Sequence, residues 1–203
     1  AKLSGDVNKF RMDEARGAIE GLSQTLATTL FYGDTSIDPE KFLGFTSRYD
    51  DLSAGNSDAI INEGDSSNLA SIWLVNWRED KCHGIRPMGS DTGLTHEDLG
   101  EDRLFDGSNN PYQGYVSHLK QNIGLCVRDW RYVVRACNID VNALVTDGGS
   151  GPDIREIMID MVEAMKDING SPRFYMPRTI RTYLRHQLSN KANVWLDMDN
   201  IAG

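Results

Sequence analysis

Residues 91–93, Asp-Thr-Gly, match the triplet of the aspartic proteases. That chemistry needs two carboxylates about 3 Å apart that share one proton, so it also needs a second triplet or a symmetric dimer. In proteases an apolar strand leads into the triplet, whereas here the preceding residues are Pro-Met-Gly-Ser. A surface turn therefore explains Asp91 better than a catalytic site does.

Potential metal ligands gather nearby in Cys82-His83 and in His96-Glu97-Asp98. No pair has the C-x-x-C or H-x-x-x-H spacing that directs two ligands at one metal ion. We expect His83 to satisfy a backbone group near a hairpin, and Glu97 and Asp98 to lie in a solvated loop. No metal site is predicted. A hydrolase built around Asp91, His83 and His96, either an acid protease or metal-dependent, stays open as the alternative function.

Arg178, Arg181 and Arg185 form a basic stripe at spacings of three and four on an acidic chain. Guanidinium groups bind carboxylates as well as phosphates. With 21 Lys and Arg against 30 Asp and Glu, an acidic partner in another subunit is favoured at least as much as DNA. These residues are the candidate subunit interface, and the alternative is a solvated helix face.

Composition narrows the classes of protein further. A chain of 203 residues that is 39% hydrophobic and 25% charged suits one domain, or two small ones sharing a core. It has no apolar run of the roughly 18–20 residues that span a membrane. A net charge of −9 argues against wrapping nucleic acid. Cys82, Cys126 and Cys137 indicate neither a disulfide framework nor zinc, and favour a reducing compartment.

The positions of apolar residues predict the elements. Residues 12–32 form a helix of roughly 30 Å with one buried face, ended by Gly33. Residues 71–77 form a buried strand with 82–86 as its hairpin partner, and 112–121 pair with 124–137 in a long ribbon. Residues 89–110 are a loop.

The C-terminal part is predicted to be a compact α/β layer. A helix follows an N-cap at Ser150-Gly-Pro-Asp and ends at Asn169-Gly170, a strand covers residues 173–176, and a helix covers 177–188. Asp147-Gly-Gly-Ser-Gly-Pro lacks the spacing of a phosphate-binding loop, so no cofactor is expected. The residues alone thus indicate an α+β structural protein without an evident active site.

Three long blocks carry a resemblance to a known family: ATTLFYGDTSIDPEKFLGF, SIWLVNWREDKCHGIRPMGSDTGLTHEDLG and YQGYVSHLKQNIGLCVRDWRYVVRACNID. They resemble the major capsid proteins of tailed bacteriophages and prophages, in the podovirus-type subgroup with the Hong Kong-97-type fold. PRFYMPRTIRTYLRHQL is similar to that family's strand and helix near the capsomer axis.

The resemblance implies the fold and the domains. Residues 1–145 would hold the long spine helix and the long β-hairpin of the peripheral domain. Residues 146–203 would form the compact α/β axial domain. Relatives also have an N-terminal arm and extended loop before the spine helix, and further strands after the point where this chain stops. We therefore expect a fragment or a processed product.

The resemblance also implies function. The chain would be a non-enzymatic subunit that assembles with itself into hexamers and pentamers of an icosahedral shell around double-stranded DNA, contacting the DNA only weakly and non-specifically. It would be assembled in the bacterial cytoplasm and reside in the virion, with scaffolding or decoration proteins as further partners and no membrane contact. A monomeric binding module is a third reading.

Overall fold

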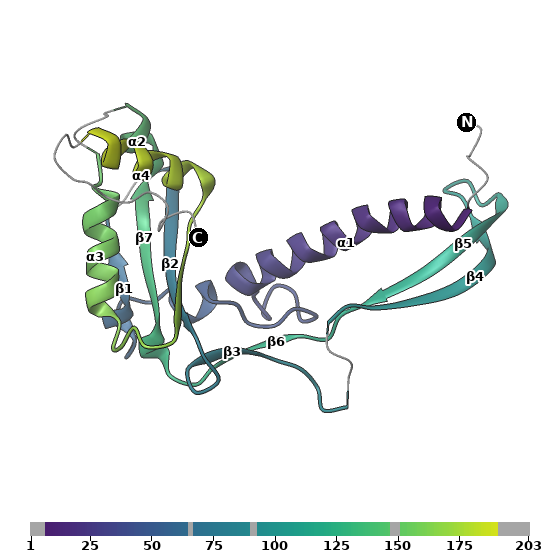
Figure 1. The fold of residues 1–203 in the computed structure, drawn as a ribbon, viewed down its shortest axis with the longest axis horizontal. Coiled ribbons are helices and arrows are strands. Elements are labelled where there is room, and N and C mark those ends of the chain that lie inside the picture. The colour runs from purple at the N-terminus through teal and green to yellow at the C-terminus, as the bar shows by residue number, and fades with distance from the viewer. Residues whose placement is uncertain (1–6, 65–66, 90–92, 147–150, 191–203) are drawn as a thin grey trace. The chain divides into compact units, whose positions relative to one another are not determined.

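The structure is a computed structural model that describes residues 7–64, 67–89, 93–146 and 151–190 (Figure 1). The chain forms two compact units. The first contains Ala1–Ser47 and Gly84–Cys126, and the second contains Arg48–His83 and Val127–Gly203. The predicted division near residue 145 falls inside the second unit, because strand and helix residues on both sides of it share one hydrophobic core. Each unit is described below by itself.

A long helix, α1 (Val7–Tyr32), opens the first unit and confirms the helix predicted for residues 12–32. The helix ends where expected, at Gly33, whose amide donates a hydrogen bond to the Thr29 carbonyl at 2.8 Å. A Cβ on Gly33 would collide with the carbonyl oxygens of Phe42 and Thr29, so only glycine fits at this position. The predicted buried face is wrong. Met12 is 64% exposed, and Ile19 and Leu22 are also exposed, so the described residues leave this part of the face uncovered.

A two-stranded antiparallel ribbon of β4 (Thr95–Phe105) and β5 (Pro111–Lys120) also belongs to the first unit. The loop predicted for residues 89–110 is therefore wrong over 95–105, and β5 pairs with β4 rather than with residues 124–137. Asp106 fixes the turn, because its carboxylate accepts hydrogen bonds from the amides of Ser108 and Asn110.

The second unit is built on a sheet in which β7 (Val133–Asp140) lies between β1 (Ile60–Asn62) and β2 (Leu69–Trp77). β8 (Ser171–Tyr175) pairs with β2. β1 runs parallel to β7, while the β7–β2 and β2–β8 pairs are antiparallel. The strands predicted at residues 71–77 and 173–176 are confirmed. A 3-10 turn, η2 (Ser57–Ala59), leads into β1.

The single long strand predicted for residues 124–137 is wrong. It divides into β6 (Gly124–Val127), a 3-10 turn η3 (Trp130–Tyr132) and β7. Asp129 causes the break, because its carboxylate accepts from the Arg131 amide and caps the turn. β3 (Cys82–Ile85) meets β2 at one parallel pair, Trp77 with Cys82, so the predicted antiparallel hairpin does not form.

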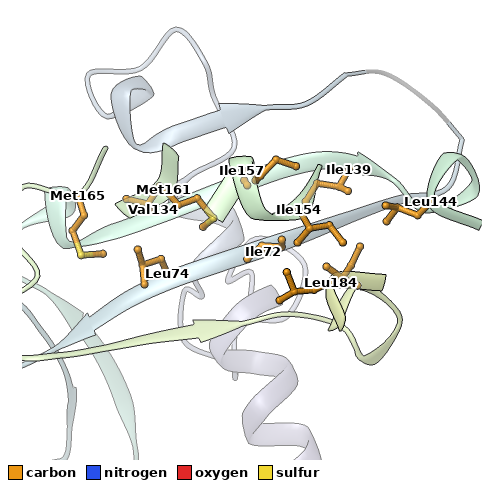
Figure 2. Close-up of a cluster of buried hydrophobic side chains, with 12 residues drawn as sticks. Ile72, Leu74, Val134, Ile139, Leu144, Ile154, Ile157, Met161, Met165 and Leu184 are labelled. Carbon is orange, nitrogen blue, oxygen red and sulfur yellow. The ribbon is translucent and has the colours of Figure 1, made fainter. Parts of the chain in front are cut away.

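Three helices complete the second unit: α2 (Val141–Thr146), α3 (Ile154–Ala164) and α4 (Arg178–Asn190). α3 and α4 cover one face of the sheet. Figure 2 shows their inward side chains meeting those of β2 and β7. The residues predicted to point inward from both helices are confirmed in this core: Ile154, Ile157, Met158, Met161, Val162, Met165, Ile180, Tyr183, Leu184 and Leu188.

The boundaries of α3 differ from those predicted. Asp153 is its N-cap and accepts from the Arg155 amide at 3.1 Å, whereas Ser150 lies outside the described residues. The helix ends at Ala164 rather than at residue 169. In the described part of the chain, no helix combines the length and the apolar character that crossing a membrane would require.

Candidate functional site

The residues of the alternative hydrolase reading are distributed over both units. His83 lies on β3 in the second unit, His96 lies exposed on β4 in the first, and Asp91 is outside the described residues. The Nδ1 atom of His83 is buried without a hydrogen-bond partner among the described residues, so the backbone partner expected for this imidazole is not found at that nitrogen. Within the same ranges, no group of three His, Cys, Asp or Glu side chains could hold a metal ion.

A hollow of about 410 Å³ lies in the second unit and is lined by Arg48, Tyr49, Gly55, Asn56, Val127 and Trp130. The Tyr49 hydroxyl donates to the Trp130 carbonyl at 2.9 Å, and the Asn56 amide donates to the Arg48 carbonyl at 2.8 Å. Burial raises the pKa of Tyr49. The polar groups of Tyr49 and Asn56 thus form hydrogen bonds with other residues of the lining. The lining contains no carboxylate, imidazole or thiol.

Arg11 on α1 binds the ribbon through several contacts at once. Its guanidinium makes two hydrogen bonds to the Asp98 carboxylate, at 2.8 and 2.5 Å, and one to the Ser117 hydroxyl at 3.2 Å. It also lies 4.7 Å from the centre of the Tyr115 ring. Asp98 stands at a β-bulge, where Gly100 adopts a φ of +77° and donates its amide to the same carboxylate. This clamp fastens the helix to the ribbon.

The expectation that Asp98 lies in a solvated loop is wrong, and the reason is electrostatic. The hydrogen bonds from Arg11, followed by the one from Gly100, lower the pKa of Asp98 from 3.8 to about 2. Because the folded-state pKa is the lower one, the stabilisation by the ion pair is present above about pH 4 and is lost as the pH falls through about 2.

Replacing Arg11 with glutamine is therefore expected to raise the pKa of Asp98 towards 3.8, leaving the smaller lowering due to Gly100 and His96. Carboxyl-resolved NMR titration measures this shift directly. Arg16→Gln is the matched control, because Arg16 is an exposed α1 arginine that pairs with Asp13 on its own helix. A midpoint for Asp98 that is unchanged in Arg11→Gln would contradict the clamp.

The predicted basic stripe lies on one exposed face of α4. Arg178, Arg181 and Arg185 are all exposed, while Ile180 and Leu184 of the same helix are buried in the core. Within the described ranges, none of the three guanidinium groups has an ion-pair partner within 4 Å. The stripe is thus unpaired among the described residues, and whether it forms a subunit interface stays a prediction.

Two buried polar side chains that sequence reasoning missed hold the loop between α3 and β8. The Asn76 amide donates to the carbonyls of Asp167 and Asn169 at 2.9 and 3.2 Å, and its oxygen accepts from the Ser171 amide at 3.1 Å. The ammonium of Lys81, which is 2% exposed, donates to the same Asn169 carbonyl. Asn and Lys within an aromatic strand-and-turn segment gave no sequence signal of this role.

Comparisons with known proteins bear on identity. Residues 1–203 match the family described as Major capsid protein GP7. Among solved structures, the chain is similar to a chain in the structure of bacteriophage Epsilon15 derived from cryo-EM and modelling, with 31% sequence identity and a TM-score of 0.69. The match covers 96% of this chain and 60% of the Epsilon15 chain, so the present chain spans about three fifths of the latter's length. None of the curated proteins matches.

The structural match also confirms the predicted fold class, an α+β capsid-protein fold. The family match extends over the whole length of the sequence, as the resemblance carried by the long sequence blocks requires. Therefore this chain belongs to the Major capsid protein GP7 family.

Proposed function

We propose that this protein is a structural subunit of a phage capsid, which assembles with copies of itself into hexamers and pentamers of an icosahedral shell around double-stranded DNA. The observation that carries the proposal is the match of all 203 residues to a major capsid protein family. The role that this family implies is structural rather than enzymatic, and the hydrolase reading has no support from the comparisons.

The surface of the first unit favours the same role. Large apolar side chains stand exposed along α1 and the ribbon, where a monomer would leave them in water: Phe10, Met12, Ile19, Leu22, Tyr32, Leu99, Phe105, Tyr112 and Tyr115. Exposed apolar side chains that form a contiguous patch often mark a contact with another molecule. Burial against neighbouring subunits would remove these side chains from water.

The charge of the chain is consistent with a container for DNA. A net charge of −9 disfavours tight binding to phosphates, so contact with packaged DNA is expected to be weak and non-specific. Scaffolding or decoration proteins are further candidate partners. The protein would be assembled in the bacterial cytoplasm and reside in the virion. We assign the spine helix and peripheral-domain role to the first unit and the axial role to the second.

Electron microscopy of the full-length protein expressed alone tests the proposal. We expect shells, tubes or separate capsomers, because subunits of this kind associate through repeated interfaces. Light scattering on the same sample gives the mass in solution. A protein that stays monomeric at every concentration, or one that cleaves peptides in a manner that requires Asp91, would contradict the proposal.

A further inference from the structure

The outward face of α3 carries an acidic stripe. Glu156, Asp160 and Glu163 follow one another at spacings of four and three, which places them on one side of the helix. All three are exposed, and none has an ion-pair partner within 4 Å in the described residues. Ile159, which is 61% exposed, stands on the same face. The outward face of α3 is therefore acidic and carries one exposed apolar residue.

A fourth acidic residue, Glu63, adds negative charge next to this stripe. Glu63, just after β1, is half-buried, and burial followed by the negative charge of Asp160 raises its pKa. A cation placed against this face would relieve the repulsion between Glu63 and Asp160. The face of α3 is thus suited to receive positive groups.

The basic stripe on α4 has the matching form. Arg178, Arg181 and Arg185 repeat over about two turns, as do the three acids of α3, and each arginine can bind a carboxylate with two hydrogen bonds. Although α3 and α4 contact each other in the core, no ion pair joins the two stripes within the described part of one chain. Within a single copy, the two stripes therefore do not pair with each other.

The two helices lie over different parts of one face of the sheet. α3 contacts β7 and η2, which lie on the β1 side of the sheet. α4 follows β8, which pairs with β2 on the side away from β7. The acidic and basic stripes thus stand at separate positions on the second unit, as two distinct patches.

We propose that the acidic stripe of α3 in one copy docks against the basic stripe of α4 in the next copy. This inference rests on the proposed function, because it assigns the contact that joins neighbouring subunits in a ring. A closed ring of five or six copies needs a head-to-tail interface, in which each copy presents two different and complementary patches. Charge pairs of this kind fix the partner and the register, while other surfaces add buried area.

Charge reversal of the full-length protein tests the docking. The acidic variant carries Arg178→Glu, Arg181→Glu and Arg185→Glu, and the basic variant carries Glu156→Lys, Asp160→Lys and Glu163→Lys. Each places like charges opposite each other at every interface. We expect each variant alone to lose ring formation, measured by light scattering and electron microscopy. Circular dichroism of each variant should stay as in the wild type, because the six side chains are exposed.

A mixture of the two variants gives the sharpest expectation. The acidic α3 stripe of the first can bind the basic α4 stripe of the second, and the lysines of the second can bind the glutamates of the first. Copies must then alternate around the ring, so six-membered rings close and five-membered rings do not. A closed icosahedral shell also needs pentamers. The mixture is therefore expected to form hexamers, tubes or sheets, without closed shells.

The variant with all six substitutions is the matched control for charge. It keeps the wild-type net charge of −9, because three gained positive groups offset three gained negative ones. We expect it to restore both five- and six-membered rings, since every interface is complementary again.

The outcomes separate this inference from the proposed function. If the wild type assembles, three results would each overturn the docking alone. They are normal assembly of either single-stripe variant, failure of the variant with six substitutions to form rings, and pentamers in the mixture. Failure of the wild type to assemble overturns both. Raising the salt from about 0.1 to 1 M shortens the screening length from about 10 to 3 Å, and should weaken wild-type rings accordingly.

Discussion

Replacing Ile157 with alanine is expected to lower the free energy of unfolding of the second unit by about 2–5 kcal/mol. The side chain is 3% exposed and lies in the core where α3 covers β2 and β7 (Figure 2). Its removal takes apolar area out of the core and leaves a cavity that rigid neighbours fill only in part. Urea unfolding followed by tryptophan fluorescence measures the loss, because Trp73, Trp77 and Trp130 all belong to this unit.

Ile159→Ala is the matched control, because it makes the same change two positions along the same helix. Ile159 is 61% exposed, so its truncation should alter the free energy of unfolding by no more than about 0.5 kcal/mol. Equal losses at the two positions would contradict the assignment of the inward face of α3.

The elements that the sequence predicted well are those whose apolar residues are buried within their own unit. The spacing of apolar residues along α3 and α4 identified the inward residues, because those helices lie on a sheet within one core. The strand at residues 71–77 was found for the same reason, since Ile72, Leu74 and Val75 are buried.

The elements predicted wrongly are those whose residues are not buried within their own unit. β4 reads THEDLGEDRLF, a polar run whose side chains are mostly exposed, so the sequence shows no apolar alternation there and favours a loop. α1 has an apolar stripe, yet Met12, Ile19 and Leu22 of that stripe stay exposed. The pattern identified the helix but could not show whether the subunit itself or a neighbour covers it.

The candidate site was predictable only in part. The spacing of Arg178, Arg181 and Arg185 is visible in the sequence as a basic stripe on an acidic chain. Their exposure, and the matching acidic stripe on α3, required the packing of both helices. The contact of Arg11 with Asp98 joins residues distant in the sequence, and no local pattern encodes it.

Replacing Asn76 with alanine is expected to cost the second unit about 2–4 kcal/mol of unfolding free energy. The change removes three hydrogen bonds, and a buried polar group left without a partner costs about 1–3 kcal/mol. The Asp167 carbonyl and the Ser171 amide lose the partner that Asn76 provides, whereas the Asn169 carbonyl keeps Lys81. Urea unfolding with tryptophan fluorescence measures the loss. Asn68→Ala, which removes one exposed bond to Asn142, should change stability by no more than about 0.5 kcal/mol.

Gly170 allows the same contact to be tested from the other side. It has a φ of +136°, and a Cβ there would collide with the side-chain oxygen of Asn76, so Gly170→Ala should be destabilising through both strain and the collision. In the Asn76→Ala background the collision is absent and only the backbone strain remains. The two losses should therefore sum to more than the loss of the double variant, as expected for residues in direct contact. Strictly additive losses would show that Asn76 does not hold the loop at Gly170.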